Sequence, residues 1–272
     1  MRGSDRGDAR DLPALANALA PVVREAGAIA LAAFGKPIKT WVKEHNSPET
    51  EADIAINLML RERLSAIAPD AGWLSEETED DPARLEASRV WIVDPIDGTR
   101  AFMAGRPDWA ISVALVEARR PVVAALYAPV SDEFFAAVAG AGATRNGAAV
   151  TVSSGGAIEG ARIGGPRGFL DRIAAVAPAF AVPPRIHSLA LRLARVADGT
   201  IDAAFASRTS RDWDLAAADL LVHEAGGALT TTGGMTLAYN GVTTVHDVLV
   251  AAGLERHQTL TALLRDRPDL MR

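Results

Sequence analysis

Cysteine is absent from the 272 residues, and this absence excludes disulfide bonds and thiolate metal sites. Any metal ion must therefore be held by Asp, Glu, His or carbonyl oxygen. Aromatic residues make up only 5% of the chain, so the core has to be packed with Ala, Leu, Val and Ile. A chain without cysteine also suits the reducing cytoplasm, where we expect this protein to reside.

Positive charge is also in short supply, because 28 Lys and Arg residues face 34 Asp and Glu residues and leave a net charge of −6. An acidic chain disfavours a surface that binds nucleic acid polymers. No apolar run reaches the length of a membrane span without a charge, and the first apolar region carries Arg24 and Glu25 in its middle. That region is a poor signal peptide, so we expect a soluble protein without membrane insertion.

Apolar periodicity divides the first half of the chain into helices and strands. The spacing predicts helices over 13–34 and 50–67 and strands over 90–93, 111–116, 122–127, 134–138 and 150–152. A polar turn around 118–121 predicts a hairpin, and Asn146-Gly147 predicts a tight turn. Residues 1–10 are polar and contain glycine, so we expect a flexible tail there.

The second half mixes helices and strands without repeating the first. The pattern predicts helices over 188–199, 214–225 and 254–264, strands over 201–206 and 248–251, and a loop over 160–168. Frequent hairpins favour a layered α+β fold with largely antiparallel sheets. The Gly, Ser and Ala content near 140–155 predicts a boundary between subdomains over 11–145 and 146–272.

Two carboxylates follow the strand predicted over 90–93. Asp94 ends this strand, Asp97 comes one turn later, and Gly98-Thr99 opens a short helix whose free N–H groups favour an anion such as phosphate. Two like charges about 4 Å apart repel by roughly 4 kcal/mol at an effective dielectric near 20. A divalent cation resolves this conflict, and hard oxygen ligands favour Mg²⁺ over Zn²⁺. The alternative is a plain surface Asp-Pro turn.

Three further segments carry acids, and each has a structural interpretation beside the functional one. Glu76 and Glu77 are adjacent glutamates, which commonly mark a solvated helix start or loop. Asp214 stands at a predicted helix N-terminus, where it either caps the helix or supplies a carboxylate. Thr50 and Asp53 have the spacing of a capping box, and on these residues alone capping is favoured over a role for Asp53 as proton acceptor.

Other motifs support no competing chemistry. The five histidines show no metal-ligand spacing, and Gly35-Lys36-Pro37 lacks the upstream glycine and the hydroxyl of a P-loop. Phosphatases of the haloacid dehalogenase type use Asp-x-Asp and form an aspartyl-phosphate, whereas two residues separate Asp94 from Asp97. A non-catalytic metal- or phosphate-binding regulator is the alternative from another class.

Taken together, the acidic segments are specific in their combination and order. They are Thr50-Glu51-Ala52-Asp53, Ser75-Glu76-Glu77, Asp94-Pro95-Ile96-Asp97-Gly98-Thr99 and Trp213-Asp214-Leu215-Ala216-Ala217. With this combination, residues 13–265 resemble the inositol monophosphatase family of Mg²⁺-dependent, lithium-sensitive phosphatases. The resemblance implies a layered α/β/α/β/α sandwich with mostly antiparallel sheets. It also implies a phosphoric monoester hydrolase that acts on a small phosphate ester and forms a homodimer.

The same resemblance implies a set of metal ligands. Glu76, Asp94 and the carbonyl of Ile96 would hold one Mg²⁺, and Asp94, Asp97 and Asp214 would hold a second. A more weakly held third ion would contact Glu76 through water. The family therefore implies two to three ions per site.

Catalytic and phosphate-binding roles are implied in the same way. The implied catalytic residues are Asp53, Glu76 and Thr99, and the implied contacts of the substrate phosphate are Asp97, Gly98, Thr99 and Asp214. Thr99 would help to activate the attacking water while Asp53 accepts its proton. Lys43 lies in a segment that can approach the site in this family.

Two positions depart from the family pattern. Ser75 stands where Gly is usual, and we expect little effect because the ligand is the carboxylate of the next residue. Ser207 stands where inositol-specific members carry a glutamate that contacts inositol hydroxyls, and Arg208 and Arg211 lie nearby. Arginines suit a substrate with a second phosphate, so Arg208 is a predicted substrate contact.

The bacterial branch that hydrolyses 3'(2'),5'-bisphosphonucleosides is similar throughout. The similarity includes Trp73-Leu74-Ser75-Glu76-Glu77 and Gly105-Arg106-Pro107-Asp108-Trp109. Adenosine 3',5'-bisphosphate therefore ranks first as the expected substrate. Inositol monophosphate ranks second, with fructose 1,6-bisphosphate as a related alternative.

Overall fold

The structure is a computed structural model that describes residues 12–42 and 48–271. Its helices are α1 (Leu12–Ala33), α2 (Glu51–Ile67), α3 (Thr99–Met103), α4 (Arg167–Ala174), α5 (Leu189–Ala197), α6 (Asp212–Glu224) and α7 (Leu254–Asp266), with short 3-10 helices η2 (Pro82–Glu86) and η3 (Pro268–Met271). Its strands are β1 (Thr40–Val42), β2 (Pro48–Thr50), β3 (Gly72–Ser75), β4 (Arg89–Asp97), β5 (Ala110–Glu117), β6 (Arg120–Ala128), β7 (Glu133–Val138), β8 (Gly142–Arg145), β9 (Ala148–Ala149), β10 (Ile163–Gly164), β11 (Ala203–Ala206), β12 (Gly227–Thr231) and β13 (Leu249–Gly253). The predicted tail and Lys43 lie outside the described residues.

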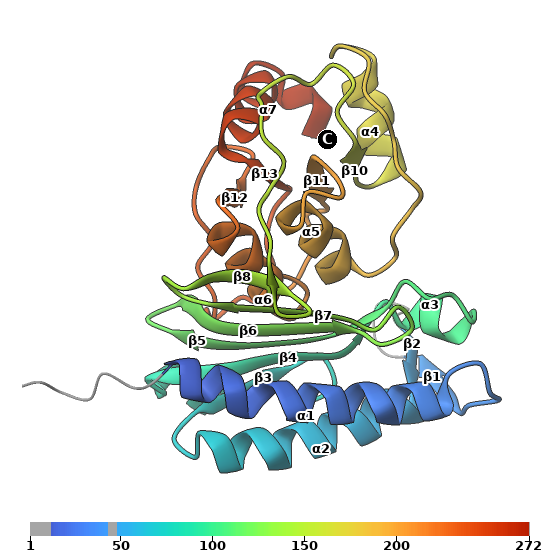
Figure 1. Cartoon of the computed structure of the whole chain (residues 1–272), viewed down its shortest axis with the longest axis vertical. Coiled ribbons are helices and arrows are strands. Elements are labelled where there is room, and N and C mark those ends of the chain that lie inside the picture. The colour runs from blue at the N-terminus through green and yellow to red at the C-terminus, as the bar shows by residue number, and fades with distance from the viewer. Residues whose placement is uncertain (1–11, 43–47, 272) are drawn as a thin grey trace, which may run out of the picture.

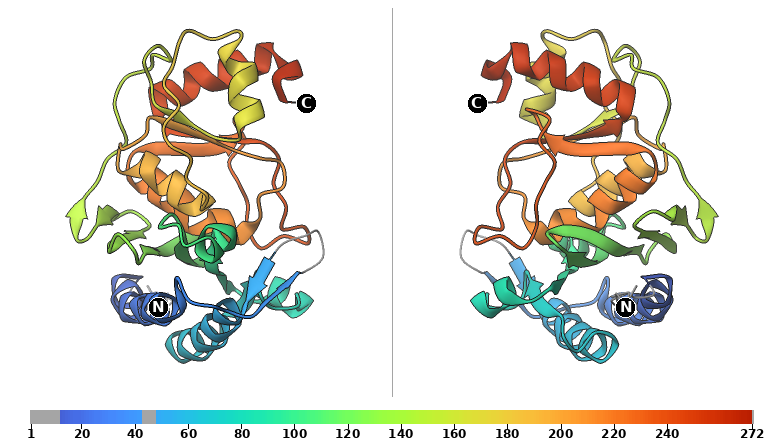
Figure 2. Two further views of the ribbon diagram at one scale, coloured as in Figure 1. Left: turned by 90° about the vertical axis from the view of Figure 1, so that its right-hand side faces the viewer. Right: turned by 90° about the vertical axis from the view of Figure 1, so that its left-hand side faces the viewer.

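The elements form five layers. Helices α1 and α2 cover one face of a seven-stranded sheet, α5 and α6 lie between this sheet and a four-stranded one, and α4 and α7 lie beyond the second sheet (Figure 1). Figure 2 shows α7 at the opposite end of the molecule from α1 and α2. The strand orders are β3-β4-β5-β6-β7-β8-β9 and β10-β11-β13-β12, beside a small antiparallel sheet of β1 and β2. Among the strands within 12–42 and 48–271, only the pairs β3–β4 and β10–β11 are parallel. The predicted α+β sandwich with mostly antiparallel sheets is confirmed.

Strand β4 is covered on both faces, which explains its uninterrupted apolar run. Trp91 and Val93 pack in the cluster shared with α1 and α2, whereas Val90 and Ile92 pack in the cluster shared with α5 and α6. A strand that is buried on both sides has no need of polar alternation. The acids that follow this run therefore start from a rigid, fully enclosed base.

Helix α6 is buried on both sides, and its mid-helix Asp219 is paired with Arg120 at 2.9 Å. It contacts β4 to β8 on one side and β12 on the other, and buries Leu215, Leu220 and Leu221 between the two sheets. Its small residues Ala216–Ala218 let both sheets approach closely, and burial of each leucine contributes about 2 kcal/mol. The first turn of α6, with Asp214, is held in the middle layer as a result.

Most predicted elements agree with the structure. The five predicted helices are confirmed, with starts that differ by at most two residues from α1, α2, α5, α6 and α7. The hairpin of β5 and β6 is also confirmed, and its turn places Ala118 and Arg119 at positive φ. The strand predicted to end at Asp94 instead continues as β4 to Asp97, with an irregular register between the two acids.

Two predictions in the middle of the chain are wrong. No strand forms over 150–152, because the turn at Asn146-Gly147 starts the return strand β9 at once and that strand ends after two residues. Val152 then donates its N–H to Ala225 as the chain leaves the sheet. The loop predicted over 160–168 contains β10 and the start of α4, because Ile163 and Gly164 pair in parallel with β11.

Helix α1 is long and apolar enough to cross a membrane by length and composition. One face of it is buried at Leu19, Val23 and Ala30, and it packs on α2 and β6. Its central charges are also engaged, because Arg24 pairs with Asp132 at 3.4 Å. These contacts are those of a helix in the core of a layered protein.

Candidate metal and phosphate site

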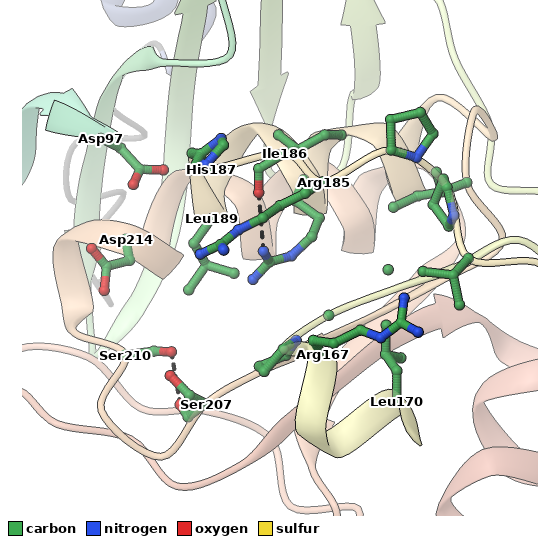
Figure 3. Close-up of a pocket in the computed structure, with 18 of the residues that line it drawn as sticks. Asp97, Arg167, Leu170, Arg185, Ile186, His187, Leu189, Ser207, Ser210 and Asp214 are labelled. Atoms are coloured by element: carbon green, nitrogen blue, oxygen red, sulfur yellow. Dashed lines mark hydrogen bonds between the residues drawn. The ribbon is translucent and has the colours of Figure 1, made fainter. Parts of the chain in front are cut away.

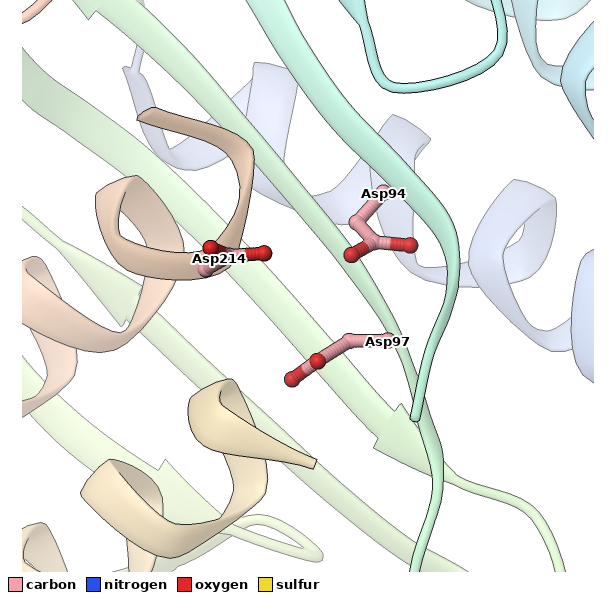
Figure 4. A group of neighbouring side chains, drawn as sticks. All are labelled: Asp94, Asp97 and Asp214. Carbon is pink, nitrogen blue, oxygen red and sulfur yellow. The ribbon is translucent and has the colours of Figure 1, made fainter. Parts of the chain in front are cut away.

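Three carboxylates from two distant parts of the chain meet at one point. Asp94 and Asp97 come from the end of β4 and Asp214 from the first turn of α6, and Figure 4 shows the three side chains converging. One oxygen from each lies within 4.8 Å of the others. The sequence predicted these three residues as ligands of a shared ion, and the fold brings them together.

The backbone between Asp94 and Asp97 is bent so that both acids face the same way. The β4–β5 register shifts there, and the N–H of Ile96 donates to Asp94 Oδ1 at 3.0 Å. Gly98 follows at φ +97°, where a Cβ would lie 3.2 Å from the backbone nitrogen of Ser188. Only glycine satisfies both the left-handed conformation and this close approach.

Asp97 and Asp214 are each fixed by hydrogen bonds to helix starts. Asp97 Oδ2 accepts from the Ser188 hydroxyl and from the N–H of Ala190, both at 2.6 Å, at the N-terminus of α5. Asp214 Oδ2 accepts from the N–H of Arg211 at 2.7 Å, ahead of α6. The helix-start role predicted for Asp214 is therefore present, whereas the bonds of Asp97 to the start of α5 were not predicted.

Burial and mutual repulsion perturb all three acids. Asp94 is 1% exposed, and burial raises its pKa well above the usual range, with Glu76, Asp97 and Asp214 adding to the effect. Burial raises the pKa of Asp97 to about 6, against hydrogen bonds from Ser188 and Ala190 that lower it. Burial and the charge of Asp97 likewise raise the pKa of Asp214. The cluster is an unfavourable place for negative charge unless a cation compensates it.

The residues fit a hard divalent cation. Asp94 Oδ2 is buried and has no hydrogen-bond partner among residues 12–42 and 48–271. A buried carboxylate oxygen without a donor is costly unless an ion binds it. Three carboxylate oxygens that converge, without thiolate or histidine, form the donor set that Mg²⁺ prefers.

Glu76 reaches the cluster from the neighbouring strand. Strand β3 pairs in parallel with β4, Ser75 lies opposite Val93, and the N–H of Glu76 donates to the Val93 carbonyl at 3.3 Å. Its charge contributes to the raised pKa of Asp94, Asp97 and Asp214. Glu76 lies outside the group whose oxygens are within 4.8 Å of one another.

Ser75 adds contacts that a glycine would lack. Its hydroxyl donates to Asn57 Oδ1 at 2.7 Å and accepts from the N–H of Glu77 at 3.3 Å. The same Asn57 donates to Thr78 Oγ1 at 2.9 Å. The side chain at this position thus ties α2 to the turn that carries Glu76.

Asp53 and Thr99 are both buried near the start of their helices. Asp53 completes a capping box with Thr50, whose N–H donates to Asp53 Oδ2 at 2.8 Å, so the predicted cap is confirmed. The Thr99 hydroxyl donates to the Ile96 carbonyl at 3.1 Å, which is the carbonyl predicted to bind metal. A proton transfer from Thr99 to Asp53 requires this hydroxyl to turn, and the transfer stays a prediction.

A cavity of about 750 Å³ adjoins the carboxylates. Asp97 and Asp214 lie at one end of it, and Arg167 and Arg185 also line it (Figure 3). Arg192 is a further lining residue, together with apolar and uncharged polar residues. The cavity is therefore negative where the ion site lies and positive beyond it. Such a gradient suits a ligand that carries an anionic group at a distance from the reacting centre.

Of the three arginines that line the cavity, Arg192 is the one whose Nε is buried. Its Nη1 and Nη2 donate to the carbonyls of Ile186 and Phe205 at 3.2 and 3.4 Å. Its Nε is buried and has no hydrogen-bond partner within the described part of the chain. Burial lowers the pKa of Arg192 to about 10, against the raising effect of Asp97. A guanidinium in this position gains from a nearby anion.

The arginines predicted beside Trp213 lie elsewhere. Arg208 and Arg211 do not line this cavity, whereas Ser207 does. Arg208 approaches Asp247 at 3.9 Å, with 61% of its side chain exposed. Arg211 stacks over the Trp213 ring at 5.7 Å and lines a separate hollow beside Glu76.

Sequence reasoning missed the arginines of the cavity and the bond from Ser188 to Asp97. Arg192 lies within an amphipathic helix, where an arginine is usually interpreted as a solvated residue. Arg185 follows Pro183-Pro184, and two consecutive prolines were a usable signal for a rigid segment. Proximity of these residues to Asp97 depends on packing between α5 and β4, which no local pattern encodes.

Comparison with known proteins places the chain among phosphatases. The inositol monophosphatase family matches residues 11–269. The inositol-1-monophosphatase of Rhizobium meliloti (strain 1021) is 35% identical over 232 residues, which are 81% of this chain and 86% of that protein. The 3'(2'),5'-bisphosphate nucleotidase CysQ of Aggregatibacter actinomycetemcomitans is 28% identical over 241 residues, 80% and 85% of the two chains. The crystal structure of the extragenic suppressor protein suhB from Bartonella henselae superposes with a TM-score of 0.82 at 27% identity, covering 93% of this chain and 99% of that one.

Proposed function

Because the chain belongs to the inositol monophosphatase family and is a phosphoric monoester hydrolase, we propose that it is a Mg²⁺-dependent phosphatase of substrates with a second phosphate. Adenosine 3',5'-bisphosphate ranks first, with AMP as the product. The proposed ligands are Glu76, Asp94, the Ile96 carbonyl, Asp97 and Asp214, for two to three ions. Magnesium bound there would lower the pKa of a water molecule and stabilise charge on the phosphoryl oxygens.

The protein's own groups would orient the reaction. The backbone of Gly98 and Thr99 would bind phosphate oxygens, and the hydrogen bonds of Asp97 and Asp214 would keep those carboxylates in place. Thr99, with Asp53 as the proton acceptor, would orient the attacking water. The water oxygen bonds to phosphorus as the ester P–O bond breaks, and the alcohol leaves with a proton. No covalent phosphoenzyme is needed.

One observation supports the preference for a second phosphate. Arg167, Arg185 and Arg192 line the cavity beyond the carboxylates, and the buried Nε of Arg192 has no partner among the described residues. Guanidinium groups bind phosphate with two parallel hydrogen bonds, which makes them strong and directional partners. An inositol ring with one phosphate would leave these charges without an anion.

Inositol monophosphate is the second candidate. The relative from Rhizobium meliloti carries that activity in its name and is the more similar of the two named enzymes, at 35% against 28% identity. Ser207 argues against it, because this cavity residue stands where inositol-specific members carry a glutamate. The two candidate substrates differ in the residues that would contact the part of the substrate away from the reacting phosphate.

A panel of three substrates tests the proposal. Phosphate release from adenosine 3',5'-bisphosphate, inositol 1-phosphate and fructose 1,6-bisphosphate would be measured with Mg²⁺ and with EDTA, and with added Li⁺. We expect kcat/KM for the bisphosphonucleoside to exceed that for inositol 1-phosphate by roughly tenfold or more, as an additional charge-assisted contact implies. Millimolar Li⁺ should inhibit.

The other results have distinct meanings. A preference for inositol 1-phosphate would favour the second candidate. No Mg²⁺-dependent release from any substrate would favour a non-catalytic regulator, and a trapped phosphoenzyme would favour the aspartyl-phosphate mechanism. A cytoplasmic location, a homodimer and the subdomain boundary near 140–155 stay predictions, as does the role of Lys43.

A further inference from the structure

Arg84 is a buried arginine whose donors are all engaged. Only 2% of its side chain is exposed. A guanidinium has five N–H donors, and Arg84 makes five hydrogen bonds. Its Nε and Nη2 donate to Asp80 at 2.5 and 2.7 Å, Nη1 donates to Asn240 Oδ1 at 2.6 Å, and Nη1 and Nη2 both donate to the Gly241 carbonyl at 3.1 Å. Because every N–H donor of the guanidinium is hydrogen-bonded, the Arg84 side chain is held in one conformation.

These bonds join two loops that are far apart in sequence. Arg84 and Asp80 belong to the segment that follows Glu76, whereas Asn240 and Gly241 lie 156 and 157 residues later. Asn240 returns a bond by donating its Nδ2 to the Arg84 carbonyl at 3.1 Å. The contact therefore resists both separation and sliding.

The second loop is in turn bonded to the start of α6. The N–H of Asn240 donates to Asp212 Oδ2 at 2.8 Å, and the ring of His246 contacts Asp212 Oδ1 at 2.6 Å. The N–H of Asp212 donates to the Thr244 carbonyl at 2.9 Å. Asp212 is fully buried and stands two residues before Asp214. A continuous chain of hydrogen bonds thus leads from Arg84 to the helix turn that carries Asp214.

On the other side, Arg84 is fixed against the strand that ends before Glu76. Helix η2 packs on β3, and a Cβ on Gly72 would lie 3.2 Å from the Arg84 backbone. The two loops face each other across a hollow of about 340 Å³ lined by Glu76 and Asp80 from one and by Thr243 and Thr244 from the other. The sheet itself holds the start of α6 at one point, because the Ser112 hydroxyl of β5 donates to the Trp213 carbonyl at 3.2 Å. The hydrogen bonds of Arg84 add a second connection, on the side of the loop that carries Glu76.

We propose that Arg84 is a positioning residue that sets the distance between Glu76 and Asp214 across the ion site. The inference rests on the proposed metal-binding roles of those two carboxylates. Arg84 touches neither substrate nor ion. A displacement of about 1 Å in a reacting group can cost on the order of a hundredfold in rate, so a rigid bridge between two separately carried ligands has a large effect.

The test compares Arg84→Met with the wild-type protein. Mg²⁺ binding would be measured by isothermal titration calorimetry, alongside the Mg²⁺ concentration for half-maximal activity, kcat, and KM for substrate. We expect the variant to bind Mg²⁺ roughly tenfold or more weakly, as outer-shell changes do at other metal sites. The half-maximal Mg²⁺ concentration should rise in parallel, and KM at saturating Mg²⁺ should stay within a factor of about two.

Arg256→Met is the matched control. Arg256 is also buried, at 6% exposure, and donates to Ala157, Ser153 and Ser154 at 3.0, 3.1 and 3.3 Å, between α7 and the segment ahead of β10. Its loss should lower Tm without changing Mg²⁺ affinity. An equal loss of Mg²⁺ affinity in both variants would reduce Arg84 to a general stabilising role and overturn the inference.

Asn240→Gly covers the case in which Arg84→Met does not fold. Asn240 has φ +55°, which glycine adopts without strain, and its backbone bond to Asp212 survives. This variant loses only the side-chain bonds to Arg84, and its Mg²⁺ affinity should fall by a few-fold. If a folded Arg84 or Asn240 variant binds Mg²⁺ as tightly as the wild-type protein does, the inference about Arg84 is overturned, but the proposed function is not. Failure of the wild-type protein to bind Mg²⁺ would instead overturn the proposed function.

Discussion

The carboxylate cluster and the arginine-lined cavity adjoin each other but are built in opposite ways. Asp94 and Asp97 are 1% and 7% exposed and stand at the end of a strand enclosed on both faces. Arg167 leaves 79% of its side chain in solvent, although it lines the same cavity as Asp97. The first region has one geometry, whereas the second can adjust to its ligand. The reaction is thus placed on rigid elements and the choice of substrate on adaptable ones.

The largest effect is expected from a change in the rigid carboxylate cluster. Asp94→Asn should lower Mg²⁺-dependent phosphate release by roughly a thousandfold or more, because it removes a charge shared by both proposed ions. The fold should persist, since the change also removes a buried charge whose pKa is strongly raised. Phosphate release and Tm in EDTA check both statements. Near-normal turnover at saturating Mg²⁺ would contradict the metal assignment.

A smaller effect is expected from a change in the arginine-lined cavity. Arg192→Met should lower kcat/KM for adenosine 3',5'-bisphosphate by about 10- to 100-fold, the loss of a charge-assisted contact, and should affect inositol 1-phosphate far less. Arg208→Met is the control, because Arg208 pairs with Asp247 outside the cavity, and it should stay within about twofold of wild type. If Arg208→Met lowers kcat/KM for the bisphosphonucleoside more than Arg192→Met does, Arg208 is the substrate contact.

A third change tests whether the cavity can be redirected. Ser207→Glu places an acid at the rim, where the Ser207 hydroxyl now contacts Thr209 at 3.1 Å. Repulsion should lower kcat/KM for the bisphosphonucleoside by several-fold, about 1 kcal/mol at an effective dielectric near 20 for charges well separated in the cavity. Use of inositol 1-phosphate should rise or stay constant. Equal losses on both substrates would indicate damage to the site instead of altered specificity.

The smallest effect is a shift in stability with pH. The pKa of Asp97 is raised to about 6, so its favourable contribution to folding is present at low pH and lost as the pH rises through that value. Bound Mg²⁺ requires the ionised form. Added Mg²⁺ should therefore raise Tm by several degrees at about pH 7.5 and by almost nothing at about pH 5. Differential scanning fluorimetry with Mg²⁺ or EDTA checks this, with Asp94→Asn as a control that should not respond.

Much of the fold could be predicted because its signals are local. The apolar run of β4 and the capping residues Thr50 and Ser188 each act within one turn or strand. The elements missed, such as β10 and β12, are short and stabilised by neighbours in the sheet instead of by their own pattern. Residues 150–152 have the composition of a strand, but the chain leaves the sheet after β9, so the strand predicted there does not form.

The residues of the candidate site likewise divide into those that local sequence patterns predict and those that depend on tertiary packing. Asp94, Asp97 and Asp214 could be predicted because their order along the chain is specific and their helix or strand ends are readable. Arg192 and Arg84 could not, because an arginine that is buried by tertiary packing looks the same in sequence as one on a solvated face. The predicted substrate contact Arg208 stays a prediction, and its proximity to Trp213 in sequence did not place it among the residues that line the cavity.

The sequence by itself determined the carboxylates, the absence of thiolate ligands and the order of most helices and strands. Those features depend on residue type and on spacing within a few turns. Only the tertiary structure decided which arginine side chains line the cavity and what holds Glu76 and Asp214 at a fixed distance. Both depend on contacts between segments far apart in the sequence, such as Arg84 with Asn240, which is 156 positions away, and the free energy of such contacts exists only when the layers have packed.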